Sequence, residues 1–81
     1  MVDSGPCVYC GSADDTTVDH IVALAQGGHE AEYNLVPACN PCNSSKSDTP
    51  LGRWYPERVA HASAHSMKVR VALTVEVLLA A

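Results

Sequence analysis

The chain has 81 residues and a net charge of −4, with nine acidic and five basic side chains. A chain this short buries a modest fraction of its surface, so a hydrophobic core alone would leave it only marginally stable. We therefore expect a covalent or metal cross-link. Its apolar runs fall short of the roughly 18 residues of a membrane-spanning helix, so we expect no membrane contact.

Two Cys-x-x-Cys pairs frame the first half of the sequence, Cys7 with Cys10 and Cys39 with Cys42. Two disulfides or one structural zinc ion are the alternatives. A disulfide between thiols two residues apart is strained and closes almost no loop, whereas both thiols of such a pair can point at one ion. The residues before Cys7 do not have the pattern of a signal peptide, which favours a reducing, cytoplasmic location. We therefore expect structural Zn²⁺ held by all four cysteines.

The segment Thr16–Val22 is rich in β-branched residues and predicts the first strand. Alternation along a regular strand places Asp19 and His20 on opposite faces. For both side chains to serve one site, the strand has to end or bulge near His20.

A loop is predicted over residues 23–32, because this stretch contains Gly27-Gly28 and has no strong periodicity. A short helical turn is expected at residues 30–33. The second strand is predicted over Tyr33–Pro37. Proline has no N–H to donate to a sheet, so this strand is expected to end at Pro37 or to lie at a sheet edge.

A helix is predicted from Asn40, because an N-capping side chain followed by a proline such as Pro41 is a common helix start. The helix carries Asn43 and Lys46 on its first turns. It is expected to stop before Pro50, since the residue before a proline disfavours helical geometry.

The C-terminal part combines a connector with two further elements. Trp54 is expected to pack on the first cysteine pair or on the preceding helix, and a short helix is predicted over residues 57–65. Residues 68–79 alternate in a period of two, which predicts a strand with one buried face and a natural dimer seam. A helix is the alternative, because four of these residues also share one helical side: Ala72, Val75, Leu78 and Leu79.

Five elements follow one another within residues 7–48. They are Cys7-x-x-Cys10, Asp19-His20-Ile21, Gly27-Gly28, Asn34-Leu35 and Cys39-x-x-Cys42-Asn43-x-x-Lys46. In this combination they resemble the HNH endonuclease family, as a small free-standing, phage-type member. The resemblance implies a small α+β zinc-stabilised domain, the ββα-metal finger, with two short antiparallel strands packed on one helix. We expect a single domain of residues 1–81, with its core at 7–50 and an extension at 51–81.

The resemblance also implies roles for individual residues. Phosphodiester hydrolysis needs an activated water, and His20 is expected to be the general base that takes its proton. Asp19 and Asn43 offer oxygen ligands for one catalytic Mg²⁺ or Mn²⁺. Asn34 is expected to pin the loop between the strands so that His20 is held in place, and Lys46 is expected to contact a phosphate.

The implied function is metal-dependent hydrolysis of DNA, with double-stranded DNA as the expected substrate. Two alternatives stay open. The first is a zinc-stabilised module that binds DNA or protein without cleaving it. The second is an accessory nuclease subunit of a phage DNA-packaging machine.

The distribution of charge bears on these partners. Residues 1–45 contain six acidic side chains and no lysine or arginine, whereas residues 46–81 contain five basic and three acidic side chains. Affinity for nucleic acids comes largely from neutralised phosphates. DNA contact is therefore expected from residue 46 onward, from the catalytic cation, from a second subunit in a homodimer or from a basic partner protein.

Overall fold

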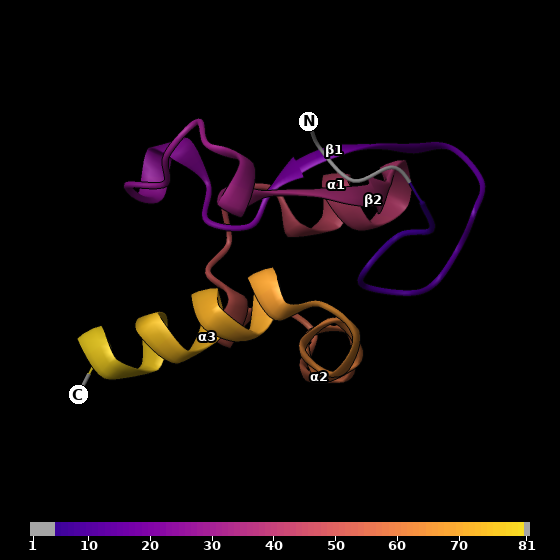
Figure 1. The fold of residues 1–81 in the computed structure, drawn as a ribbon. Coiled ribbons are helices and arrows are strands. Elements are labelled where there is room, and N and C mark those ends of the chain that lie inside the picture. Colours follow the sequence, from indigo (N-terminus) through magenta and orange to yellow (C-terminus); the bar gives the residue numbers. More distant parts are fainter. Residues whose placement is uncertain (1–4, 81) are drawn as a thin grey trace.

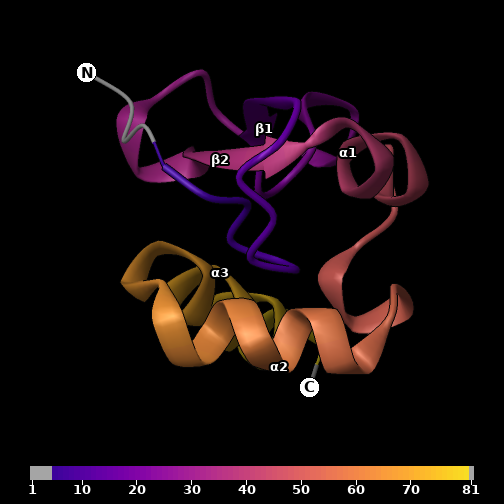
Figure 2. The same ribbon diagram turned by 90° about the vertical axis from the view of Figure 1, so that its right-hand side faces the viewer.

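A computed structural model describes residues 5–80 (Figure 1). Two strands and the helix after them form one layer, and two further helices form a second layer beneath it (Figures 1 and 2). The elements in chain order are β1 Thr16–His20, the 3₁₀ helices η1 Leu24–Gln26 and η2 Glu32–Asn34, β2 Leu35–Cys39, α1 Asn40–Lys46, the 3₁₀ helix η3 Leu51–Arg53, α2 Pro56–His65 and α3 Met67–Ala80. The predicted α+β fold, with two antiparallel strands followed by a helix, is confirmed. None of the described helices combines the length and the apolar character needed to cross a membrane.

The first strand ends at His20. β1 pairs with β2 in antiparallel register, with His20 opposite Leu35. The predicted strand extended to Val22, but the N–H of Val22 donates to the side chain of Asn34 at 2.9 Å and so leaves the ladder. The expectation that the strand ends or bulges near His20 is confirmed.

The second strand lies at an edge of the sheet. Within the described part of the chain the sheet has two strands, so β2 pairs with β1 alone. Pro37 lies within β2 opposite Val18, and its carbonyl accepts the N–H of Val8 at 3.0 Å on the other side. The strand is shifted two residues later than predicted, because η2 occupies the residues before Leu35. Of the two alternatives for Pro37, the edge position holds.

Helix α1 begins at Asn40, so Asn40 is the first helical residue and not the N-cap. Cys39 takes the position before the first helical residue, and no side chain bonds the first turn. The predicted cap at Asn40 is therefore wrong. Pro41 is accommodated in the first turn, where its missing N–H has no helical partner to lose. The helix stops at Lys46, before Pro50, as predicted.

The core draws on both layers. The ring of Trp54 meets Tyr9 edge-on with 4.9 Å between centroids, and its Nε1–H donates to the hydroxyl of Ser45 on α1 at 3.0 Å. Trp54 therefore packs on the first cysteine turn and on the helix, as expected. The buried apolar residues are Cys7, Tyr9, Ile21, Val36, Ala38, Cys39, Cys42, Leu51, Trp54, Val59, Ala62 and Val69.

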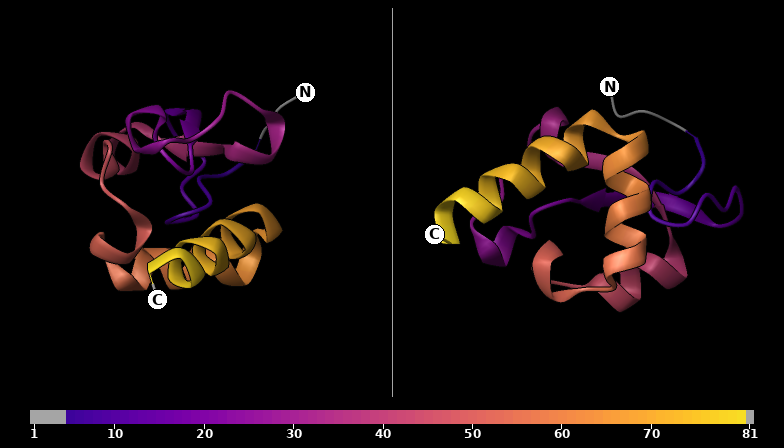
Figure 3. Two further views of the ribbon diagram at one scale, coloured as in Figure 1. Left: turned by 90° about the vertical axis from the view of Figure 1, so that its left-hand side faces the viewer. Right: turned by 90° about the horizontal axis from the view of Figure 1, so that it is seen from below.

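The C-terminal segment is helical, so the predicted strand over residues 68–79 is wrong. The predicted helix over residues 57–65 is confirmed as α2, and α3 packs against it in a different direction (Figure 3). The more buried side of α3 has helical spacing: Val69, Ala72, Leu73 and Glu76. The sequence of α3 fits the period of a strand and the period of a helix. As a helix, the segment packs on α2 and buries Val69, whereas a strand would need a partner strand. The predicted dimer interface depended on an exposed strand edge, which the helical α3 does not provide.

Two valines of α3 distinguish the helix from the strand experimentally. Val69 is completely buried and Val71 is 54% exposed, although both would lie on one face of a strand. We expect Val69→Asp to lower the free energy of unfolding by more than about 3 kcal/mol, because it buries an unpaired charge. Val71→Asp is expected to change it by less than about 0.5 kcal/mol. Urea unfolding measures both, and equal effects would contradict the helical packing.

Candidate functional site

Four cysteine sulfurs converge on one point at the base of the strands. The Sγ atoms of Cys7, Cys10, Cys39 and Cys42 all lie within 4.8 Å of one another. All four cysteines are free, and the Sγ atoms of Cys10 and Cys39 are 3.6 Å apart, well beyond the roughly 2.05 Å of a disulfide. Four thiolates at about 2.3 Å from a tetrahedral ion stand about 3.8 Å from one another. The spacing therefore fits a metal ion and not two disulfides.

Burial and hydrogen bonding shift the pKa values of three of these thiols. Burial acts to raise the pKa of Cys7, but hydrogen bonds with the backbone of Cys39, Tyr9 and Cys10 outweigh it and bring this pKa down to about 7. Burial raises the pKa of the Cys39 thiol, although hydrogen bonds with Cys42 act to lower it. Burial also raises the pKa of the Cys42 thiol, and hydrogen bonds with the other cysteine side chains raise it further. A divalent cation bound by the four sulfurs would offset the repulsion between thiolates. The donor set thus has the chemistry of a structural metal site.

Asp19 lies just inside the end of β1 and is only 5% exposed. Its Oδ2 atom accepts the hydroxyl of Tyr9 at 2.8 Å and lies 3.2 Å from the ammonium of Lys46. Burial, together with the nearby Asp19 carboxylate, raises the pKa of Tyr9, so the phenol stays protonated and donates. Asp19 is therefore held in place from the first cysteine turn and from α1.

Lys46 occupies the interior of the molecule, with no exposed surface. Besides the ion pair with Asp19, its ammonium donates to the carbonyl of His20 at 2.8 Å. The predicted contact between Lys46 and a phosphate is therefore wrong for this structure. The reason is that the inner side of α1 directs the lysine toward β1, where it joins helix and strand.

His20 stands at the end of β1 with its ring at the surface. Its side chain is 29% exposed, and Nε2 lies 2.8 Å from Oε1 of Glu30, whose side chain is 68% exposed. Sequence reasoning missed Glu30, because it lies ten positions after His20 in an aperiodic loop. Only the folded loop brings the carboxylate to the imidazole.

Asn34 is buried where the loop rejoins the sheet. Its Oδ1 accepts the N–H of Val22, and its Nδ2 donates to the carbonyls of Val22 and His29, each at 2.9 Å. One amide thus bonds both ends of the segment between Val22 and His29. Gly28 allows the same loop to approach Val22 closely, because a Cβ at this position would lie 1.8 Å from the carbonyl oxygen of Val22.

Asn43 is half-buried on α1, three residues before Lys46. Side chains three apart share one side of a helix, and Lys46 reaches Asp19 and the carbonyl of His20 from that side. The structure thus brings α1, with Asn43, against the strand end that carries Asp19 and His20.

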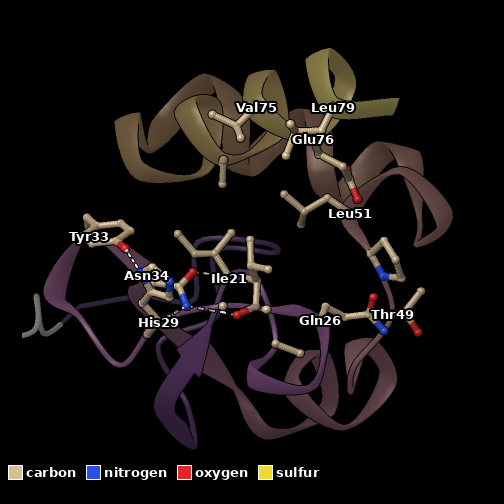
Figure 4. A pocket seen from close by; sticks show the side chains of 16 residues that line it. Ile21, Gln26, His29, Tyr33, Asn34, Thr49, Leu51, Val75, Glu76 and Leu79 are labelled. Carbon is tan, nitrogen blue, oxygen red and sulfur yellow. Dashed lines mark hydrogen bonds between the residues drawn. The ribbon is translucent and has the colours of Figure 1, made fainter. Parts of the chain in front are cut away.

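A cavity of about 360 Å³ opens beside this strand end, between the loop and α3 (Figure 4). Ile21, His29 and Tyr33 line one wall, and Val75 and Leu79 line the other. Asp19, His20 and Asn43 lie outside its lining. The cavity is therefore distinct from the candidate catalytic groups.

Comparisons with known proteins agree with this geometry. A family model described as HNH endonuclease matches residues 7–49, more than half of the chain. The chain is 44% identical over 52 residues to the CRISPR-associated endonuclease Cas9 of Corynebacterium diphtheriae, and 42% identical over 52 residues to that of Actinomyces naeslundii. Each match covers 59% of this chain and 5% of the relative's length. This chain therefore belongs to the HNH endonuclease family.

Proposed function

We propose that the chain is a metal-dependent endonuclease that hydrolyses DNA phosphodiester bonds, with His20 as general base and Asp19 and Asn43 as ligands of one Mg²⁺ or Mn²⁺. One observation carries the proposal. The strand ends at His20, and α1 packs against this end through the side that bears Asn43. These contacts support a site formed by His20, the buried Asp19 and the half-buried Asn43, where α1 packs on the end of β1.

The three side chains have the chemistry that hydrolysis requires. A neutral imidazole can take a proton from water, and the partial exposure of His20 gives water access to the ring. A carboxylate and an amide oxygen are ligands suited to a hard cation, and they favour Mg²⁺ or Mn²⁺ over softer metals. When bound, such a cation stabilises negative charge on the phosphate and on the leaving oxygen.

Buried neighbours hold these groups in place. Lys46 fixes the carbonyl of His20 and the carboxylate of Asp19 at the same time. Asn34 fixes the backbone immediately after His20 through its bonds to Val22. We infer that both act on catalysis by positioning, and that neither contacts the substrate.

We further infer that the four-cysteine cluster holds Zn²⁺. Four thiolates at tetrahedral spacing are the typical ligand set of a structural zinc ion. Because the four sulfurs close the coordination shell, no position is left for a substrate. The zinc is therefore expected to hold the finger together and to take no part in hydrolysis.

Three of the five basic side chains are engaged within the molecule. Lys46 is buried, Lys68 donates to the carbonyl of Leu35, and Arg70 donates to the carbonyls of Ser63 and Ala64. This favours a second form of the proposal, in which a basic partner or a longer protein holds the DNA while this chain cuts it. The small share of the Cas9 relatives that the chain spans fits the second form.

A plasmid-nicking assay tests the proposal. We expect the protein to convert supercoiled plasmid to relaxed circles when Mg²⁺ or Mn²⁺ is supplied, and to leave it intact when the metal is omitted. Omission is preferable to a chelator, which would also attack the cysteine site. The ends produced are expected to be a 5′-phosphate and a 3′-hydroxyl, which ligation without prior end repair detects.

The other outcomes separate the alternatives. Binding of DNA that is equally tight with and without Mg²⁺, with no nicking under any condition, would indicate a binding module without activity. Nicking that appears only after a basic DNA-binding segment is fused to the chain would support the second form.

A further inference from the structure

We propose that Glu30 is a positioning residue for His20, which fixes the ring's tautomer and orientation so that Nδ1 faces the attacking water. This inference rests on the proposed nuclease function, in which His20 is the general base. The observation behind it is the 2.8 Å contact between Nε2 of His20 and Oε1 of Glu30.

The chemistry of the pair assigns the proton. An ionised carboxylate has only acceptor atoms, so Nε2 has to be the nitrogen that carries the hydrogen. In a neutral imidazole the other nitrogen, Nδ1, then has a free lone pair. Glu30 thus selects which ring nitrogen of His20 can accept a proton from water.

The backbone around Glu30 is held more firmly than its exposure implies. On one side, Nδ2 of Asn34 donates to the carbonyl of His29 at 2.9 Å. On the other, the backbone N–H of Asn34 donates to the carbonyl of Ala31 at 2.8 Å. Asn34 therefore bonds both neighbours of Glu30 and aims this residue at His20.

A second contact fixes the residue before Glu30. Nδ1 of His29 lies 2.7 Å from the hydroxyl of Tyr33. His20 is secured separately, because its carbonyl accepts the ammonium of Lys46 at 2.8 Å. The backbones of Glu30 and His20 are thus held by separate hydrogen bonds, which keeps the carboxylate beside the imidazole ring.

Exposed ion pairs contribute little to stability, which makes a catalytic role separable from a structural one. Removing a group that orients a metal-ligating histidine typically costs about tenfold to a hundredfold in metal affinity or activity, and we expect an effect of similar size for His20. We expect Glu30→Ala to lower kcat for plasmid nicking by about tenfold, with KM and the melting temperature unchanged. Glu30→Gln keeps an oxygen that can accept Nε2–H, so it is expected to retain most of the activity.

The matched control is Glu57→Gln, which removes an exposed acidic charge from the first turn of α2. We expect it to leave kcat unchanged. The direct readout is ¹⁵N NMR of the imidazoles in alkaline buffer, where unperturbed histidine is neutral. The His20 signals, identified by their loss in His20→Ala, are expected to show the Nε2–H tautomer in wild type and Glu30→Gln, and a mixture in Glu30→Ala.

Two results would overturn the inference: an unchanged tautomer in Glu30→Ala, or a kcat for Glu30→Ala equal to or above that of wild type. Failure of the proposed function looks different. If the wild type does not nick DNA, the tautomer measurement still decides whether Glu30 orients His20. If the wild type nicks DNA and His20→Ala does not, the kinetics of Glu30→Ala decide it as well.

Discussion

His20→Ala is expected to lower the rate of metal-dependent plasmid nicking by at least about a hundredfold, since general-base catalysis typically contributes about 10²–10⁴-fold. Alanine removes the imidazole of His20 and leaves Asp19 and Asn43 in place. Attack by water on the phosphodiester then lacks a proton acceptor. The measurement is the initial rate of relaxed-circle formation at saturating Mg²⁺, compared with wild type.

The structure provides a control for this substitution. His65 is exposed on α2, and its Nδ1 contacts the carbonyl of His61 within the same helix. We expect His65→Ala to nick at the wild-type rate. Both variants are expected to keep the wild-type melting temperature, because the ring of His20 is partly exposed and its side chain lies outside the core. Equal nicking by His20→Ala and wild type would end the assignment of His20 as base.

Removal of the metal from the four-cysteine cluster is expected to unfold the protein. Structural zinc contributes about 10–16 kcal/mol to the folding of small domains, and the total stability of a domain is about 5–15 kcal/mol. The site joins the first cysteine turn to the junction of β2 and α1, so its loss releases both. We expect a strong chelator, or Cys42→Ser, to abolish the cooperative thermal transition followed by far-UV circular dichroism.

Reconstitution distinguishes loss of metal from general damage. Zn²⁺ at one equivalent per chain is expected to restore the transition in the chelated wild type, whereas Mg²⁺ is not, because thiolates are poor ligands for it. Ser44→Ala, an exposed change within α1, serves as the matched control and is expected to melt like wild type. A metal-free protein that still unfolds cooperatively at the wild-type temperature would contradict a structural role for the ion.

The two strands, the loop between them and the cysteine pairs could be predicted from the spacing of nearby residues in the sequence. A Cys-x-x-Cys pair predicts two thiols that can share an ion, and a β-branched run followed by Gly27-Gly28 predicts a strand and a loop. The end of the strand at His20 followed from what Asp19 and His20 have to do together. Each of these features depends on neighbours in the sequence, which is why each could be predicted.

The rest depends on contacts between distant residues. The burial of Lys46 is decided by the orientation of α1 over β1, and the approach of Glu30 to His20 by the fold of the loop that Asn34 clamps. Residues 68–79 fit either period, so packing on α2 decided between them. None of these outcomes is encoded in a short window of sequence.

The buried Lys46 has a consequence for the potential that a phosphate meets at the strand end. Lysine and Asp19 lie 3.2 Å apart, so their charges cancel locally although the first half of the chain is acidic. A divalent cation bound by Asp19 would keep its attraction for a polyanion, because Lys46 already balances the charge of this carboxylate. At the proposed cleavage site, an acidic protein would in this way present a small electropositive spot to DNA.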